Sequence, residues 1–259
     1  MGELVFIGLG LHDEKGITLR GLEEARACDV VFAEFYTSAL LGTKIGAVEA
    51  LIGKPIRRLL RDQVERGEDV LEAAKDRRVA FLVAGDPMVA TTHVDLRLRA
   101  AAAGIPTQVI HGVSILGAAA GALGLQAYKF GRTTTVPFPA PNRPVTSPLD
   151  PILENLRAGL HTLVLLDLRE DGSFLDPKVA LESLLAMATS KDAAGFGPQT
   201  LVCVLSRVGS PEMHIETGAI RGLLKRDLGP PLHCLVVPGR LHFLEKDALI
   251  AFAAAPHDL

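Results

Sequence analysis

The chain has 259 residues, of which 48% are hydrophobic, and its formal net charge at pH 7 is −3. This length suits one large or two moderate domains, and the low charge without a long Lys/Arg run disfavours a protein that binds nucleic acid mainly through phosphate contacts. The cysteines stand far apart and form no CxxC pair, which disfavours a metal site and fits buried thiols in a reducing compartment: Cys28, Cys203 and Cys234.

The first half of the chain alternates apolar strands with helices, which is the pattern of a parallel sheet flanked by helices. Thr18 stands where a helix N-cap is expected, and Asp62 with Glu65 form the residue pair of a capping box. We therefore predict strands at residues 4–10, 30–33, 56–59, 79–83 and 107–110, and helices at 18–28, 45–52, from 62 onward and 93–103.

The second half begins with small residues, HGVSILGAAAGALG, which predict a turn and a helix at a domain junction or subunit contact. The proline-rich stretch 136–148 predicts a loop or lid. Strands are expected at 162–168, 201–208, 213–216 and 233–239, and helices at 177–188 and 244–254. The sequence thus predicts an α/β fold with two α/β domains, residues 1–112 and 113–259.

An acidic residue follows the predicted strand 79–83 in the motif Gly85-Asp86-Pro87. Gly85 allows backbone angles that a side chain would forbid, and Pro87 disfavours a helical conformation at Asp86. The carboxylate is therefore expected on a bend at the carboxyl end of a strand, where open α/β sheets bind ligands. A helix cap or a turn explains the same acid, and the residues alone leave both interpretations open.

Other polar residues at predicted strand ends also have a structural and a functional interpretation. Glu34, with residues 35–38 after it, either lines a cleft or forms a turn. Thr91 or Thr92 either caps the helix that begins at His93, or these residues contact a substrate. Asp167 has the same ambiguity as Asp86.

Common nucleotide and hydrolase motifs are incomplete in this chain. GLGL, residues 8–11, follows the first strand, but Asp13 stands where a dinucleotide-binding motif has its third glycine. No phosphate-binding GxxxxGK[ST] is present, and Ser114 lacks the GxSxG spacing of a nucleophile elbow. No apolar run reaches bilayer length and the start lacks a basic signal segment, so a cytoplasmic protein without a membrane span is expected.

Seven stretches together resemble the diphthine synthase family, the methyltransferases of diphthamide biosynthesis within the tetrapyrrole-methylase-like superfamily. They cover nearly the whole chain and are FIGLGLHDEKGITLRGLEEA, VFAEFYTS, GDPMVATTH, IHGVSI, YKFGRTTTVPF, GLHTLVLLDL and HCLVVPGRLHF. The GDP motif is shared across the superfamily, whereas EFYTS, ATTH and YKFG are more specific. The resemblance implies a homodimer whose subunits bind S-adenosylmethionine in a cleft between two domains.

The resemblance also implies which residues bind the methyl donor and release S-adenosylhomocysteine. The apolar residues among these donor-binding residues would contact adenine and ribose, and Asp86 would face the cationic methionine end of the donor. Gly112 and Val113 depart from the small residue and proline that the family commonly has there, and Val208 replaces an alanine of some relatives. The implied donor-binding residues are Leu11, Asp86, Val89, Ser114, Ile115, Leu166, Val208 and His233.

The implied reaction is methylation of the amino group of a 3-amino-3-carboxypropyl-modified histidine on translation elongation factor 2. The amine attacks a sulfonium methyl group in line, so positioning supplies most of the acceleration and no metal is required. Glu34, Thr92 and His93 are candidates for the acceptor side, and the general base is not assigned. The alternatives are a related methyltransferase acting on a tetrapyrrole or RNA, a nucleotide-dependent oxidoreductase, or a nucleotide sensor.

Overall fold

The structure is a computed structural model that describes residues 2–35, 39–140, 145–169 and 171–259. It divides into two compact units, Met1–Ile115 and Leu116–Leu259. The sequence analysis placed the domain boundary after residue 112, within the turn that precedes this division. Each unit contains one five-stranded sheet.

The sheet of unit 1 is entirely parallel, with the order β3-β2-β4-β1-β5. Its strands carry apolar side chains on both faces because helices cover both faces. All five carboxyl ends therefore lie at one edge, as the sequence analysis predicted for a helix-flanked parallel sheet. The strands are β1 (Glu3–Gly8), β2 (Val30–Glu34), β3 (Ile56–Leu59), β4 (Arg78–Val83) and β5 (Thr107–Ile110).

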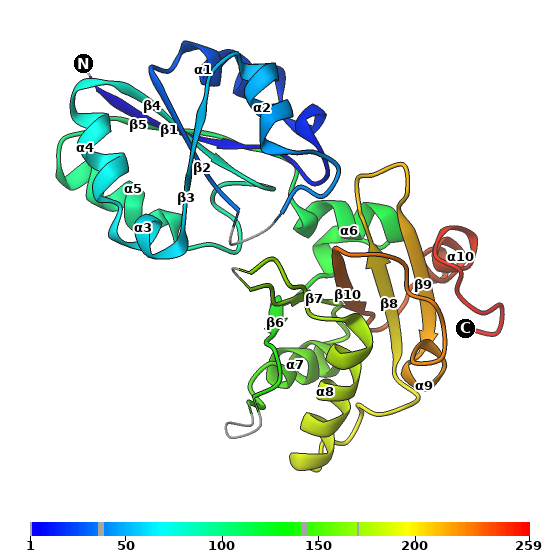
Figure 1. Ribbon diagram of the computed structural model, residues 1–259. Coiled ribbons are helices and arrows are strands. Elements are labelled where there is room, and N and C mark those ends of the chain that lie inside the picture. The colour runs from blue at the N-terminus through cyan, green and yellow to red at the C-terminus, as the bar shows by residue number, and fades with distance from the viewer. Residues whose placement is uncertain (1, 36–38, 141–144, 170) are drawn as a thin grey trace. The chain divides into compact units, whose positions relative to one another are not determined.

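Helices cover both faces of this sheet (Figure 1), and a separate core cluster lies on each face. The helices α1 (Leu19–Ala27) and α2 (Ile45–Ile52) pack on one face, through residues such as Ala25 and Val48. The other face is covered by α3 (Arg61–Arg66), α4 (Glu68–Asp76) and α5 (His93–Ala102). A short 3-10 helix, Glu14–Gly16, follows β1.

The helix starts of unit 1 confirm one predicted cap and contradict another. The Thr18 hydroxyl accepts a hydrogen bond from the Gly21 N–H at 3.0 Å, as expected of an N-cap. The capping box predicted from Asp62 and Glu65 is wrong, because the N-cap of α3 is Leu60, two residues before Asp62. The Gln63 side chain instead accepts from the Leu60 N–H at 2.8 Å.

Asp62 and Glu65 form ion pairs along the helix surface instead of capping it. Asp62 pairs with Arg66 at 3.0 Å, and Glu65 pairs with Arg61 at 2.8 Å. At α5, Thr92 occupies the N-cap position, as one of the two interpretations had it, but its side chain makes no capping hydrogen bond.

The sheet of unit 2 is mixed, with the order β6-β7-β10-β8-β9. β6 and β7 are parallel, and the other neighbouring pairs are antiparallel. The strands are β6 (Thr134–Val136), β7 (Thr162–Leu166), β8 (Leu201–Ser206), β9 (His214–Ala219) and β10 (His233–Val237). A single core cluster joins this sheet to α7 (Leu149–Ala158), α8 (Pro177–Ser190) and α9 (Ile220–Leu223).

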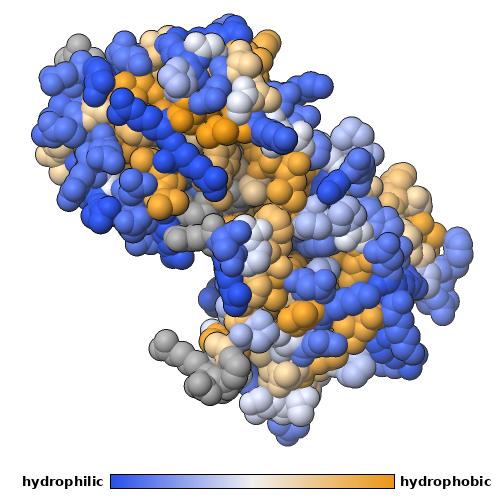
Figure 2. All heavy atoms as spheres, viewed as in Figure 1, coloured by the Kyte–Doolittle hydropathy of each residue, from blue (hydrophilic) through white to orange (hydrophobic). Residues whose placement is uncertain are grey.

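The remaining helices of unit 2 are α6 (Ile115–Leu123), which begins at the boundary, the 3-10 helix η2 (Ala127–Lys129), and α10 (Phe243–Phe252). α6 confirms the helix predicted from the small residues. Exposed apolar side chains include Leu98 of α5 and Phe252 of α10, and Figure 2 shows apolar patches among hydrophilic side chains on one face. Within the described residues, no helix is both long and apolar enough to cross a membrane.

Candidate functional site

Three glycines bring the loops at the carboxyl edge of the unit 1 sheet into backbone contact. β1 lies between β4 and β5, and it ends at Gly8. A Cβ atom on Gly8 would lie 2.5 Å from the Gly85 carbonyl oxygen and 2.5 Å from the Gly112 nitrogen. Because Gly8 has no side chain, the loops after β4 and β5 meet across the end of β1.

Backbone hydrogen bonds fix the same edge. The Gly85 N–H donates to the Gly10 carbonyl at 2.7 Å, and the Gly10 N–H donates to the Gly85 carbonyl at 3.2 Å. Both glycines have positive φ, 76° at Gly10 and 74° at Gly85, which a residue with a side chain adopts only at a cost. The motif Gly85-Asp86-Pro87 is therefore held on a bend, as predicted.

Asp86 joins two of these loops through its carboxylate. Oδ1 accepts from the Met88 N–H at 2.9 Å, within its own turn. Oδ2 lies 2.7 Å from Nδ1 of His111, which follows β5. The Asp86 side chain is only 6% exposed, whereas that of His111 is 73% exposed. Asp86 thus has a structural role in holding the loops together. It also orients the imidazole of His111, which is exposed at the sheet edge.

His93 and Glu34 form a second polar contact, buried below the loop that contains Asp86. His93 Nδ1 lies 3.0 Å from the Pro87 carbonyl, and its Nε2 lies 3.6 Å from Glu34 Oε1. Both side chains are fully buried, and burial lowers the pKa of His93 although Glu34 favours the charged form. The pair supports this loop from beneath, and neither side chain is exposed.

The other predicted donor-binding residues of unit 1 surround these loops. Leu11 follows the Gly10 turn, Val89 follows the Asp86 turn, and Ser114 and Ile115 follow Gly112. All four are partly exposed, so they contribute surface at the carboxyl edge rather than core. The structure brings these residues to one edge of unit 1. Of the EFYTS motif, residues 36–38 lie outside the described residues.

The predicted donor-binding residues of unit 2 lie together at one edge of its own sheet. Leu166 ends β7, and His233 begins β10, whose next residue pairs with Leu165. His233 also pairs with Ser206, the last residue of β8. Val208 lies two residues after Ser206. His233 Nε2 lies 3.0 Å from the Gly229 carbonyl and 3.1 Å from that of Leu228.

These contacts fix which nitrogen of His233 is protonated. A carbonyl only accepts, so Nε2 carries the proton. Burial lowers the pKa of His233, although these carbonyls and Asp176 act in the opposite direction. Burial therefore favours a neutral imidazole at the start of β10, with its proton on Nε2.

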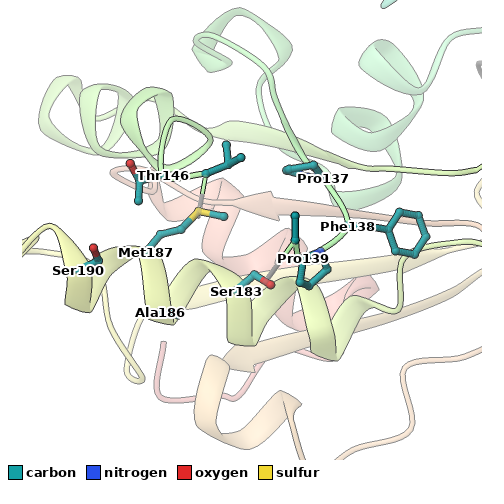
Figure 3. A pocket seen from close by; sticks show the side chains of 10 residues that line it. Pro137, Phe138, Pro139, Thr146, Ser183, Ala186, Met187 and Ser190 are labelled. Atoms are coloured by element: carbon teal, nitrogen blue, oxygen red, sulfur yellow. The ribbon is translucent and has the colours of Figure 1, made fainter. Parts of the chain in front are cut away.

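The proline-rich segment lines a pocket of unit 2 with a volume of about 190 Å³ (Figure 3). Pro137, Phe138 and Pro139 line it together with Ser183 and Met187 of α8. None of the predicted donor-binding residues lines this pocket. Residues 141–144 lie outside the described residues, so the predicted lid stays a prediction.

Asp167 belongs to the support of this segment. Its Oδ2 accepts from the Phe138 N–H at 3.4 Å, and its Oδ1 accepts from the Leu168 N–H at 3.0 Å. These bonds favour the structural interpretation of Asp167. No group of three or more His, Cys, Asp or Glu residues able to hold a metal gathers in the described part of the chain.

His111 is the residue at this edge that the sequence analysis did not single out. Its partner Asp86 is 25 positions away in sequence, and the two meet only because β1 separates β4 from β5. The available signal was position: a histidine directly after an apolar strand, before Gly112.

Three comparisons show what the chain resembles. The family model of tetrapyrrole (corrin/porphyrin) methylases matches residues 3–224. The diphthine synthase of Methanosarcina mazei is 46% identical, over 99% of this chain and 98% of the relative. That of Methanothermobacter thermautotrophicus is 45% identical, over 98% and 96%. A crystal structure of diphthine synthase superimposes with a TM-score of 0.90 at 38% identity, covering 99% of this chain and 98% of that one.

Proposed function

The chain belongs to the tetrapyrrole (corrin/porphyrin) methylase family and, within it, to the diphthine synthases, and from this premise we propose how it acts. It is a methyltransferase of diphthamide biosynthesis. The donor is S-adenosylmethionine, and S-adenosylhomocysteine leaves as product. The acceptor is the amino group of the 3-amino-3-carboxypropyl-histidine of translation elongation factor 2, and the product is the trimethylammonium diphthine.

The observation that carries this proposal is identity along the full length. At 46% identity over 99% of the chain, the likeness to a named diphthine synthase includes both units and every loop discussed above. The relatives compared above are all diphthine synthases, and none of them favours a methyltransferase acting on a tetrapyrrole or RNA, or an oxidoreductase. The family model alone is broader, since it covers methylases of several acceptors.

The residues at the carboxyl edge of unit 1 fit a donor with an apolar adenosyl part. Leu11, Val89 and Ile115 are partly exposed apolar side chains on neighbouring loops. A Cβ on Gly85 would meet no atom within 4 Å, so the space next to its backbone is open. Open α/β sheets bind ligands at this edge. We assign Leu11, Asp86, Val89, Ser114 and Ile115 to donor binding.

Leu166, Val208 and His233 are the proposed donor-binding residues of unit 2. Their clustering at one edge of the mixed sheet supports treating them as one group. His233, whose ring is held by two carbonyls, offers a fixed edge rather than a mobile charge. The proposed roles of this group and of the unit 1 group can be tested independently, by separate variants of each.

The protein contributes mainly by binding and orienting the two reactants. When bound, S-adenosylmethionine supplies an activated methyl group on a sulfonium, which is a good leaving group. Asp86 and the three glycines hold the loops in place, and Glu34 and His93 support them from below. A rigid edge of this kind lowers the entropic cost of aligning an amine with a methyl carbon.

We further propose that the protein is a cytoplasmic homodimer that binds no nucleic acid and meets the elongation factor as a protein substrate. Exposed apolar side chains such as Val94 and Leu98 of α5 would be covered in such a dimer. Sedimentation of the purified protein at twice the monomer mass is expected. A monomer at micromolar concentration would contradict the dimer without affecting the reaction.

The direct test is methylation of elongation factor 2 bearing the 3-amino-3-carboxypropyl group, followed by mass spectrometry of the modified peptide. Addition of three methyl groups is expected, and a fourth would overturn the assignment of the trimethylated product. Uroporphyrinogen-type acceptors serve as the matched control. Methylation of these acceptors, with none on the elongation factor, would overturn the proposed acceptor.

A further inference from the structure

Asp86 and His111 form a carboxylate–imidazole pair with one buried and one exposed member. Asp86 Oδ2 lies 2.7 Å from His111 Nδ1, and the exposed fractions of the two side chains are 6% and 73%. A carboxylate accepts, so Nδ1 carries the proton that it donates. In the neutral ring, Nε2 is then left with its lone pair. An acid that fixes the tautomer and orientation of a histidine in this way is a known arrangement for proton transfer.

The pair is held rigidly from both sides. The second oxygen of Asp86 is occupied by the Met88 N–H at 2.9 Å. Gly112, the residue after His111, packs against the Gly85 carbonyl so closely that a Cβ on it would lie 2.3 Å away. Neither loop can shift without disturbing the other, so the imidazole stays at the edge where the donor is proposed to bind.

Three other titratable groups near this edge are engaged elsewhere. His93 contacts the Pro87 carbonyl and faces Glu34, and both are fully buried. Asp13, in the loop after β1, accepts from the Lys15 N–H at 3.0 Å. Among the described charged groups of these elements, Asp86 is the one in contact with His111.

Two further histidine–carboxylate contacts lack this combination of a short bond and a mostly exposed ring. His161, beside Glu245, is fully buried, and His214, beside Glu216 on the edge strand β9, makes a longer contact of 3.5 Å. His111 therefore combines a short hydrogen bond to a buried acid with a solvent-exposed ring. A group that exchanges protons with a substrate needs both.

We propose that His111 is the proton acceptor of the methyl-transfer reaction and that Asp86 positions it; this inference rests on the function proposed above. The substrate ammonium gives one proton to Nε2, and the freed nitrogen lone pair forms the new N–C bond. The C–S bond breaks, and its electron pair stays on the sulfur of S-adenosylhomocysteine. The imidazolium, stabilised by the Asp86 carboxylate, returns its proton to water before the next transfer.

The first test compares His111→Asn with wild type. The asparagine amide can still donate to Asp86 from a position near that of Nδ1, but it has no basic nitrogen. We expect kcat to fall about a hundredfold, with Kd for S-adenosylhomocysteine changed less than threefold and the melting temperature preserved. His257→Asn, at an exposed position near the C-terminus, is the matched control and is expected to retain wild-type turnover.

A second test asks whether a base is what the variant lacks. Imidazole added to His111→Ala is expected to raise turnover at least tenfold, with no effect on wild type. A residue that only packs or only binds substrate would give no such rescue. Wild-type kcat in His111→Asn, or a rise in KM for the elongation factor with kcat unchanged, would overturn the inference.

The positioning role of Asp86 is tested by a double-mutant cycle on kcat. Asp86→Asn is expected to lower kcat in the wild-type background and to change it less than threefold when His111 is already asparagine. Equal losses in both backgrounds would contradict positioning through His111. Failure of the proposed function is distinguishable: wild type would then transfer no methyl group, whereas failure of this inference alone leaves wild-type transfer intact and His111→Asn active.

Discussion

Two histidine–carboxylate contacts, one in each unit, are built in opposite ways. At the edge of unit 1, Asp86 is buried and His111 is exposed. In unit 2, His161 and Glu245 are both buried, and a network of further bonds surrounds them. The same two chemical groups thus form an accessible pair in the first contact and a buried structural pair in the second.

We call the buried pair of His161 and Glu245 in unit 2 the lock. It holds the YKFG segment and α10 against the start of β7. Glu245 accepts from His161 Nε2 at 3.0 Å, from the Gln126 N–H at 3.0 Å and from the His242 N–H at 2.8 Å, and it forms an ion pair with Lys129. The Gly239 N–H donates to His161 Nδ1 at 2.9 Å, so Nε2 is the protonated nitrogen. Every polar atom of the carboxylate is satisfied, which is why it tolerates burial.

The difference follows from what surrounds each pair. His111 lies in a loop at the carboxyl edge of the parallel sheet, and its side chain is 73% exposed. Glu245 instead accepts from the Gln126 and His242 N–H groups as well as from His161, and buried backbone donors of this kind need a partner. Exposure, rather than the presence of a histidine beside an acid, therefore separates the candidate for proton transfer from the structural pair.

The largest expected effect comes from removing the acid of the lock. Glu245→Ala should reduce the free energy of unfolding by about 3–5 kcal/mol, because it leaves Lys129 and two backbone N–H groups without their buried partner. Urea unfolding followed by circular dichroism measures this. The exposed Glu182→Ala on α8 is the control, with a change within about 0.5 kcal/mol. A loss below 1 kcal/mol for Glu245→Ala would contradict the lock.

The same lock predicts a pH dependence. Burial alone would raise the pKa of Glu245, but hydrogen bonds from the His242 N–H, Lys129 and their neighbours lower it from 4.5 to about 2. A lowered carboxyl pKa stabilises the folded state above the ordinary value of 4.5, and this stabilisation is lost as the pH falls toward 2.

Burial also lowers the pKa of His161, although Glu245 opposes this, so the cost of charging this imidazole appears as the pH falls below 6.5. Comparison of unfolding free energies between pH 7 and pH 3 should therefore show a shallower decline in Glu245→Gln than in wild type. Parallel curves for the two proteins would refute the assigned role of this carboxylate.

A glycine-to-alanine change tests the edge of unit 1. Gly112→Ala places a Cβ 2.3 Å from the Gly85 carbonyl, and we expect a loss of about 1–3 kcal/mol in unfolding free energy. Weaker binding of S-adenosylhomocysteine should accompany it, because the loops move apart. Gly117→Ala in α6 meets no atom within 4 Å and should be neutral or slightly stabilising. Equal stabilities of the two variants would show that the loops are not packed as described.

The smallest expected effect concerns the exposed ion pairs of α3. Asp62→Ala should cost only about 0.3–0.5 kcal/mol, as for other pairs of this spacing on a helix surface, and the loss should shrink in high salt. A salt-independent loss near 1 kcal/mol would instead indicate the capping role that the sequence suggested. The comparison marks how little such surface pairs contribute beside the buried lock.

Local patterns predicted most of the elements in unit 1. The helix at 45–52 and the strands at 56–59 and 107–110 have the predicted bounds, because a glycine or a proline stands directly at one end of each. The single helix expected after residue 62 is divided by Gly67, with φ at 65°, into α3 and α4. One glycine inside a helical pattern does not reveal by itself whether it ends the helix.

Unit 2 was less predictable. α7 was missed because it follows the proline-rich segment and contains Pro151 in its first turn, where proline is tolerated. β6 was missed because only three residues form it, and its pairing with β7 depends on the whole sheet. The mixed strand order likewise cannot be read from periodicity, which reports burial and not direction.

The candidate site divides along the same line. The bend at Asp86 could be predicted, because Gly85 and Pro87 act on their immediate neighbours. The contact with His111 could not be predicted, because it depends on β1 lying between β4 and β5 and on Gly8 leaving room for the loops. Resemblance to a family supplied the donor and acceptor, which no local pattern in the chain identifies.

The most direct measurement of the central claim, a methyl-donor site at the carboxyl edge of unit 1, is calorimetric titration of S-adenosylhomocysteine into wild type, Asp86→Ala and the exposed control Asp171→Ala. We expect wild type and Asp171→Ala to bind equally, and Asp86→Ala to bind at least tenfold more weakly, because the loops that present Leu11, Val89 and Ile115 lose their shared anchor. Equal affinity in all three proteins, or no binding by wild type, would contradict the account.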